Sequence, residues 1–196
     1  EHWLTRQWTH RGLGALVLWP LSALMAGLVA ARRLAYRRGY VSVQRLSVPV
    51  IVVGNRIAGG AGKTPTVMAV IEGLRQRGWH PGVLSRGHGR SEVKGSEPVL
   101  LDADSSTKLS ARDVGDEPWL IWRRTACPMA ISGDRILAGQ MLLSAHPEVD
   151  IVVCDDGLQH LRLARDLEIV VFDERGGGNG WLLPAGPLRE PIDTPA

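Results

Sequence analysis

The sequence predicts an α/β fold in which a parallel β-sheet carries helices on both faces. Past residue 46, short runs rich in Val, Ile and Leu alternate with helical stretches. These runs are mostly apolar throughout, as strands are when helices cover both faces of their sheet. Strand, crossover and strand in repetition favours parallel pairing. Glycine-rich and acidic motifs directly follow several of the runs, at the carboxyl ends where such sheets bind ligands.

The expected elements alternate along the chain. Strands are predicted at residues 48–53, 82–85, 98–101, 129–132, 149–154 and 167–172. Helices are predicted at residues 64–77, 117–124 and 135–144. The chain therefore divides into a leader, residues 1–46, and a core, residues 47–196, that contains the sheet.

The leader contains an uncharged stretch, residues 12–31, followed by four arginines (Arg32, Arg33, Arg37 and Arg38). Twenty apolar residues are about enough to span a bilayer. A spanning helix would place the arginines, and everything after them, in the cytoplasm. A helix lying in the membrane interface, a cleaved signal peptide and a buried core helix are the alternatives. We expect an N-terminal membrane-associated helix, and spanning and surface-lying arrangements both stay open.

Charge is distributed unevenly along the chain. Seven of the 23 basic residues and one of the 20 acidic residues fall within residues 1–46, so the leader carries +6 and the remainder −3. This pattern favours an anionic membrane surface as a partner. The core has no basic patch interleaved with aromatic residues, so we predict no nucleic-acid partner. The two cysteines are too few for a disulfide framework or a zinc site.

The segment "GNRIAGGAGKTPT", residues 54–66, follows the first apolar run and resembles a phosphate-binding loop. Bare glycine backbone lets N–H groups approach phosphate at a helix N-terminus. Lys63 would reach the β- and γ-phosphates of a nucleotide, and the Thr64 hydroxyl would bind Mg²⁺. Ile57 stands where the usual pattern has its first glycine, and an ordinary glycine turn is the alternative. The predicted segment comprises Ile57, Ala58, Gly59, Gly60, Ala61, Gly62, Lys63 and Thr64.

Two aspartates end the apolar run in "VDIVVCDDGLQH". A strand that delivers a carboxylate to its end is how nucleotide-binding enzymes of this kind hold Mg²⁺. Because neighbouring residues on a strand point to opposite faces, we expect one of Asp155 and Asp156 to serve the metal. Gln159 follows at the same edge. The alternative is a helix N-cap.

Two further motifs supply candidate residues. Asp116 and Glu117 lie in "VGDEPWL", where a helix is expected to begin. A phosphoryl acceptor needs a carboxylate to take its proton, and Asp116 is the best candidate outside the metal cluster, with helix capping as the alternative. Arg86, in "LSRGHGR", is a candidate lining residue for phosphate or substrate, and a solvated basic loop is the alternative.

Several long motifs occur in one order: "VPVIVVGNRIAGGAGKTPT", "VLSRGHGR", "GDEP", "DDGLQHLRLARDLEIVVFD" and "GNGWLLPAGPLREP". In this order, and after a basic leader, they resemble the tetraacyldisaccharide 4′-kinase family of bacterial lipid A synthesis. The resemblance implies a fold like that of P-loop NTPases. It also implies transfer of the ATP γ-phosphate to the 4′-hydroxyl of an acylated glucosamine disaccharide, at the cytoplasmic face of the inner membrane.

The resemblance also implies roles for individual residues. Lys63 and Thr64 would contact phosphate and Mg²⁺, and Asp116 would be the general base. Asp156 would be the magnesium carboxylate, with Asp155 and Gln159 in support. Glu190, in "PAGPLREP", would lie on the substrate side of the site.

The family continues with a further lobe that closes over the nucleotide, and this chain stops before it. We therefore expect a part of a longer protein, which leaves open whether this part is active alone. No obligate protein partner is predicted. The segment "GGAGKT" also resembles ATPases that position cargo on membranes or partition chromosomes. Those proteins usually have lysine where this chain has Ala58, and they dimerise on ATP.

Overall fold

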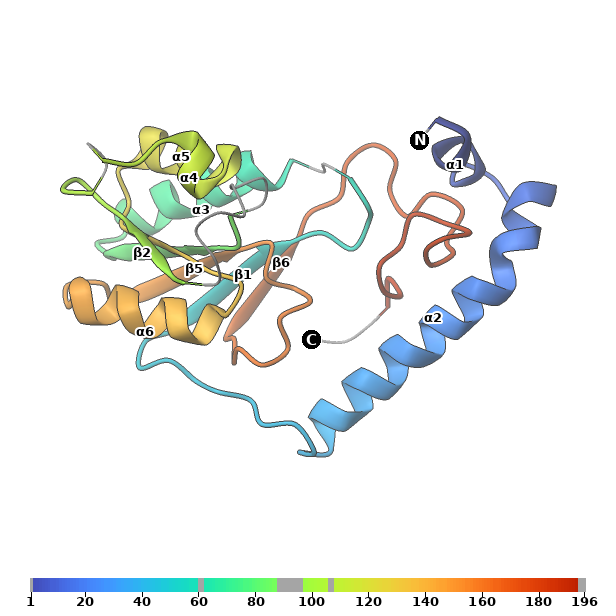
Figure 1. The fold of residues 1–196 in the computed structure, drawn as a ribbon, viewed down its shortest axis with the longest axis horizontal. Helices are drawn as coiled ribbons and strands as arrows, with labels where there is room; N and C mark the ends of the chain where they lie inside the picture. Colours follow the sequence, from blue (N-terminus) through green and yellow to red (C-terminus); the bar gives the residue numbers. More distant parts are fainter. Residues whose placement is uncertain (1, 60–61, 88–96, 106–107, 194–196) are drawn as a thin grey trace. The chain divides into compact units, whose positions relative to one another are not determined.

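The computed structural model describes residues 2–59, 62–87, 97–105 and 108–193 (Figure 1). The chain divides into two compact units. The leader unit consists of Glu1–Ser42, Asn55–Gly62 and Val170–Ala196. The sheet unit consists of Val43–Gly54 and Lys63–Ile169. The predicted phosphate-binding segment thus has residues in both units.

The sheet has six strands in the order β3-β4-β2-β5-β1-β6. The pairs β1–β5, β2–β5 and β2–β4 are parallel, as predicted. The predicted parallel arrangement does not extend to one edge of the sheet, where β3 runs antiparallel to β4. An edge strand has a single neighbour, so its direction is less constrained, and mixed sheets commonly carry such an edge. The strands are β1 (Val50–Gly54), β2 (Pro81–Ser85), β3 (Val99–Leu101), β4 (Met129–Ile131), β5 (Ile151–Asp155) and β6 (Leu167–Val170).

Helices cover both faces of the sheet, which confirms the predicted fold class. On one face lie α3 (Lys63–Arg75), α4 (Ala111–Val114) and α5 (Asp116–Thr125), and on the other lies α6 (Arg135–Ala145) (Figure 1). The helix α6 begins where Asp134 accepts hydrogen bonds from the backbone N–H groups of Ile136 (2.9 Å) and Leu137 (3.2 Å). Such a cap satisfies N–H groups that have no partner within the helix.

The core of the sheet unit explains the apolar runs. Strands β2 and β5 are buried along their whole length. Leu84 and Val153, from these neighbouring strands, have no exposed surface. Cys154 is likewise buried and forms no disulfide. Because β1, β5 and β2 are parallel neighbours, their carboxyl ends meet at one edge, with Val53 opposite Asp155 and Leu84 opposite Cys154.

The leader unit contains two helices, α1 (His2–Gln7) and α2 (Leu13–Arg37). Helix α2 is longer than the uncharged stretch and continues through the first arginines, which are good helix formers. It ends before Gly39, whose φ of +73° suits the residue after a helix end. By length and composition, α2 could cross a membrane, and only a small part of its apolar window is buried. The structure thus contains the apolar N-terminal helix that the sequence predicts.

The remaining leader-unit residues form loops. Residues 182–192 lie against both α2 and the segment that follows β1. Ile57, Leu182 and Leu188 form a small buried cluster, with Met25 and Ala26 of α2 packed against it. This cluster is the apolar centre of the leader unit among the residues that are described.

Candidate functional site

Polar side chains gather at the edge of the sheet where β1, β5 and β2 end. Strand β5 ends at Asp155 and β2 ends at Ser85. Helix α3 begins at Lys63, so the lysine lies at the helix N-terminus. The chain order that a phosphate-binding loop requires, strand then loop then helix, is therefore present.

Lys63 and Asp156 form an ion pair at this edge. The distance from Lys63 Nζ to Asp156 Oδ1 is 2.7 Å, and the lysine side chain is only 10% exposed. Asp156 has a φ of +51°, so the chain turns out of the strand at this residue. Aspartate is one of the few residues that tolerate this conformation. A side chain at the following residue, Gly157, would lie 2.6 Å from Cys154 Sγ, so the turn requires glycine.

Asp155 is buried beside this pair. Its Oδ2 accepts a hydrogen bond from Ser85 Oγ (3.3 Å), while its Oδ1 is buried and has no hydrogen-bond partner among the described residues. Burial, followed by the charges of Glu117 and Asp156, raises the pKa of Asp155 to about 6, against the opposing effects of Lys63 and Ser85. Buried polar atoms normally have partners, so an oxygen without one indicates a place for a cation or proton.

The two aspartates lie near enough for the charge of Asp156 to raise the pKa of Asp155. The strand rule separates their side chains only while the backbone is extended, and Asp156 has left the extended conformation. The alternative interpretation of this pair as a helix N-cap is wrong, because the residues that follow form turns and no helix.

Arg135 fixes the carboxyl end of β5 through hydrogen bonds. Its guanidinium is buried, donating through Nη1 to the Ser132 carbonyl and through Nη2 to the Asp155 carbonyl (3.3 Å). These bonds tie β5 to the turn between β4 and α6. Sequence reasoning missed Arg135, whose only signal was its place at the start of a helix.

Asp116 is the first residue of α5 and is exposed. The N-cap of this helix is Gly115, with a φ of +98°, so Asp116 does not have the capping role that was its alternative. Glu117, its neighbour, raises the pKa of Asp155 through its charge. The start of α5 is therefore electrostatically linked to the aspartates at the strand ends. In the sequence, Glu117 was passed over in favour of its neighbour Asp116, and Ser85 was missed beside the candidate Arg86.

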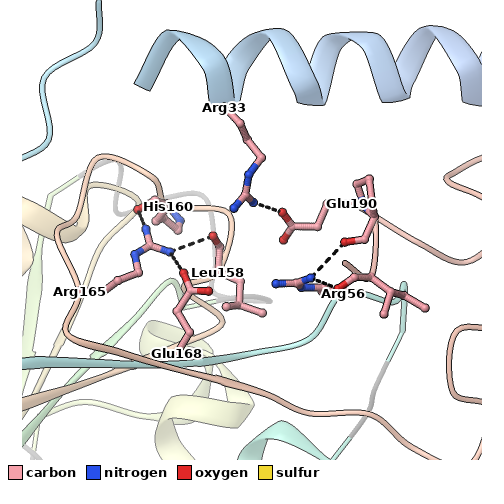
Figure 2. Close-up of polar contacts among 9 residues, drawn as sticks. Arg33, Arg56, Leu158, His160, Arg165, Glu168 and Glu190 are labelled. Carbon is pink, nitrogen blue, oxygen red and sulfur yellow. Dashed lines mark hydrogen bonds and ion pairs between the residues drawn. The ribbon is translucent and has the colours of Figure 1, made fainter. Parts of the chain in front are cut away.

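The turn that carries Asp156 is fixed by Arg165. Its guanidinium donates to the Leu158 carbonyl (3.1 Å) and the His160 carbonyl, and it pairs with Glu168 at 3.0 Å (Figure 2). Gln159, the residue between Leu158 and His160 in the chain, is half-buried. Thr64 is half-buried in the first turn of α3, and Arg86 is exposed just after β2.

The part of the predicted phosphate-binding segment that lies in the leader unit contains glycines with positive φ and residues that pack or pair within the protein. Gly59 has a φ of +96° and Gly62 a φ of +73°, values that favour glycine, and Asn55 Nδ2 donates to the Gly59 carbonyl (3.0 Å). Ile57 is 1% exposed, and Ala58 donates its N–H to the Pro187 carbonyl (2.8 Å). Ile57 and Ala58 thus pack and pair within the protein. The predicted positions Gly60 and Ala61 lie outside the described residues.

Glu190 lies in the leader unit and is 5% exposed. It forms an ion pair with Arg33 of α2, with 2.5 Å between Oε2 and Nη1 (Figure 2). The predicted substrate contact of Glu190 is not tested by this pair and stays a prediction.

Within the described ranges, no group of three or more His, Cys, Asp and Glu residues is arranged to hold a metal by itself.

Residues 14–196 match the family described as LpxK, tetraacyldisaccharide-1-P 4′-kinase. The chain is 57% identical over 192 residues to the tetraacyldisaccharide 4′-kinase of Leptothrix cholodnii, covering 98% of this chain and 53% of that protein. It is 56% identical over 195 residues to that of Methylibium petroleiphilum, covering 100% of this chain and 52% of that protein. The chain thus spans about half the length of the curated relatives it matches.

A solved structure is similar as well. The crystal structure of LpxK from Aquifex aeolicus, in complex with ATP, superimposes with a TM-score of 0.80 at 33% sequence identity. The match covers 92% of this chain and 55% of the Aquifex chain. Sequence and fold agree, and the chain therefore belongs to the tetraacyldisaccharide-1-P 4′-kinase family.

Proposed function

We propose that this chain provides the nucleotide-binding half of an ATP-dependent kinase. The reaction transfers the γ-phosphate of ATP to the 4′-hydroxyl of a tetraacylated glucosamine disaccharide, a precursor of lipid A. The observation that carries the proposal is the Lys63–Asp156 pair, with Asp155 beside it, at the strand ends of a chain of this family.

Each residue at the strand ends has a role in this reaction. Lys63 neutralises charge on the transferred phosphoryl group, which is where catalysis of phosphoryl transfer needs it. The Thr64 hydroxyl and the Asp156 carboxylate would supply oxygen ligands to a nucleotide-bound metal. Asp116 takes the proton of the attacking hydroxyl as general base. Arg86, exposed beyond β2, lines the approach of the substrate.

The residues present fit Mg²⁺. Magnesium prefers oxygen ligands, and Asp155 has a buried oxygen without a hydrogen-bond partner in the described part of the chain. Asp155 and Asp156 would hold the ion together with Thr64, and the side-chain oxygen of Gln159 would support them. An ion held by these residues would supply positive charge against the negative charge that develops on the transferred phosphoryl group. Arg135 and Ser85 keep the Asp155 carboxylate and its backbone in place for this role.

The leader suits a substrate that stays in a membrane. Several acyl chains hold such a lipid in the bilayer at about 0.8 kcal/mol per buried CH₂ group. The apolar helix α2 and its arginines bring the enzyme to the same surface, each arginine adding about 1 kcal/mol near anionic lipids. We place the reaction at the cytoplasmic face of the bacterial inner membrane, with no obligate protein partner.

The test uses the protein at the full length of its reading frame, with labelled ATP and the acylated disaccharide in detergent micelles. The Lys63→Ala and Asp116→Asn variants should transfer phosphate slower by on the order of 10²-fold or more, because each removes a group that acts on the reacting atoms. Lys108→Ala, which removes an exposed lysine of the sheet unit, is the matched control and should be unchanged.

Nucleotide affinity separates the two roles. Asp116→Asn should bind ATP as the unmodified protein does, because Asp116 acts on the acceptor. A near-normal rate for this variant would remove Asp116 from the base role. ATP-dependent dimerisation without any transfer to the lipid would overturn the proposed function in favour of a cargo-positioning ATPase.

A further inference from the structure

We propose that Arg33 of the leader helix α2 is a positioning residue for the phosphate-binding segment, acting through its ion pair with Glu190. The inference rests on the proposed function only in that residues 55–62 belong to a nucleotide site. All the contacts that carry it lie within the leader unit. It gives Glu190 a positioning role, and the substrate contact expected from its motif stays a separate prediction.

The ion pair itself is largely shielded from water. The Arg33 side chain is 15% exposed and that of Glu190 is 7% exposed, with 2.5 Å between the charged atoms. A carboxylate that has lost its water must keep a charged partner, because an uncompensated buried charge is strongly unfavourable. The pair therefore fixes where Glu190 lies relative to α2.

Residues on either side of Leu188 form backbone hydrogen bonds at the start of the phosphate-binding segment. Arg189 donates its N–H to the Arg56 carbonyl (2.7 Å), and Ala58 donates its N–H to the Pro187 carbonyl (2.8 Å). Between these two bonds, Ile57 and Leu188 form an antiparallel bridge. Glu190 thus directly follows this short ladder of backbone bonds, and a shift of Glu190 would displace the ladder.

The Arg56 side chain closes the same contact from the other direction. It is 6% exposed, and its Nη1 donates to the Pro191 carbonyl (3.1 Å) and to the Ile192 carbonyl (Figure 2). Glu190 therefore lies between the backbone ladder at Arg189 and the side-chain bonds at Pro191. Arg56, directly before the phosphate-binding residues, thus accepts the bond from Arg189 through its carbonyl and donates the bonds to Pro191 and Ile192 through its side chain.

The contact face of α2 has helical spacing. Ser22 accepts a hydrogen bond from the Ala185 N–H (2.9 Å) and donates to the Leu182 carbonyl (2.7 Å). Met25 and Ala26 pack against the cluster that contains Ile57, and Arg33 follows two turns later. Positions at such intervals share one face of a helix. Leu24 and Leu28, which lie off this face, are 62% and 60% exposed.

Helix α2 therefore has two roles. Its exposed apolar side chains are free for a bilayer, while Ser22 and Arg33 hold residues 182–192, which in turn hold Arg56, Ile57 and Ala58. Arg32, next in the sequence, is exposed and lies over the Tyr36 ring, 6.0 Å from its centroid. Arg32 carries the same charge on the same helix, which makes it the matched control.

The experiment measures binding of a fluorescent ATP analogue to the full-length protein in the absence of lipid. Arg33→Gln should weaken nucleotide binding by about three- to thirty-fold, the range in which residues that act through a packed network change affinity. Arg32→Gln should leave nucleotide affinity unchanged. Both variants lose one positive charge, so a general effect of charge on nucleotide binding should appear equally in both. Nucleotide affinity in Arg33→Gln equal to that of Arg32→Gln, with the fold intact by circular dichroism, would overturn the proposal.

A charge reversal keeps the proposal testable if Arg33→Gln fails to fold. The Arg33→Glu/Glu190→Arg double variant should recover at least part of the nucleotide affinity that either single reversal loses. A purely structural role would change thermal stability without this recovery of affinity. In steady-state assays of Arg33→Gln, KM for ATP should rise while kcat at saturating ATP changes less. Because the binding assay contains no lipid, its result is independent of whether the acceptor is the proposed disaccharide.

Discussion

The sheet unit and the leader unit are each stabilised internally by a different kind of interaction. The sheet unit has neighbouring strands that are buried along their whole length and helices on both faces. Among its described residues, the leader unit has one small apolar cluster, and hydrogen bonds join residues that are far apart in the chain. Trp8 Nε1 donates to the Pro184 carbonyl (3.0 Å), and Asn179 Nδ2 donates to the carbonyls of Gln7 (3.1 Å) and Ala185 (2.8 Å).

This difference has a consequence for how each unit responds to change. A core side chain in the sheet unit contacts many others, so its loss leaves a cavity that affects the whole unit. In the leader unit, each bond is directional and joins two specific segments. Its loss should therefore loosen those segments while the sheet unit stays folded. Four substitutions test this contrast, from the largest expected effect to the smallest.

The largest effect is expected in the centre of the sheet. Leu84→Ala, on the buried strand β2, should lower the free energy of unfolding by about 2–5 kcal/mol, because it removes apolar contacts and leaves a cavity. Denaturant unfolding measures the change. Leu120→Ala, on the exposed side of α5, is the control and should change stability by less than about 0.5 kcal/mol. Equal effects of the two would contradict the idea of one continuous core.

The second effect is expected at Asp155, where strand β5 of the same unit ends. Folding raises the pKa of Asp155 from its ordinary value of 3.8 to about 6. The folded state therefore binds this proton more tightly than the unfolded chain does. The resulting stabilisation is present below pH 4 and is lost as the pH rises through 6. At pH 8 the ionised carboxylate should cost up to about 3 kcal/mol, since each pKa unit corresponds to about 1.4 kcal/mol.

Asp155→Asn should accordingly be more stable than the unmodified protein at pH 8 and similar to it near pH 4, when both are measured without magnesium. Phosphate transfer by the full-length variant should fall sharply, since the variant lacks a carboxylate that we propose holds Mg²⁺. A variant whose stability gain is the same at both pH values would show that the Asp155 charge is not its source.

The third effect tests the leader unit. Ser22→Ala removes a hydroxyl that bonds with both Leu182 and Ala185, which should cost about 1–3 kcal/mol because a buried donor and acceptor lose their partner. Hydrogen exchange should accelerate at amides of the leader unit and stay unchanged in β2 and β5. Ser144→Ala, at an exposed position of α6, is the control. Faster exchange throughout the sheet would mean that the two units unfold together.

The smallest effect is expected at His146, which follows α6. Burial lowers its pKa, but hydrogen bonds with Glu148 (2.9 Å) and Asp102 (3.2 Å) outweigh burial and raise it above the ordinary 6.5. This stabilisation is present below pH 6.5 and is lost as the pH rises through the higher folded pKa. His146→Gln should therefore lose about 1 kcal/mol or less at pH 5.5 and nothing at pH 8.5, as pH-dependent thermal unfolding can measure.

Sequence alone was sufficient for most of the sheet unit. Its apolar runs are local signals, and each became a strand within two or three residues of its predicted position. The pairing of Lys63 with Asp156 was also predictable, because a lysine after glycines and an aspartate after a strand meet wherever those strands are parallel neighbours. What could not be predicted were Ser85, Glu117 and Arg135, whose roles depend on which strands and helices become neighbours.

By itself, then, the sequence determined the family, the alternation of strands and helices, the apolar leader helix and the glycine-rich segment that precedes a helix. Each of these is encoded in a contiguous stretch of residues by periodicity or by a motif. Tertiary structure alone decided the antiparallel edge strand β3, the buried place of Asp155 and the contact of α2 with residues 182–192. Ser22 and Leu182, or Arg33 and Glu190, are more than 150 residues apart and follow no common period. Such contacts exist only once the chain has folded, because burial and hydrogen bonding select them together.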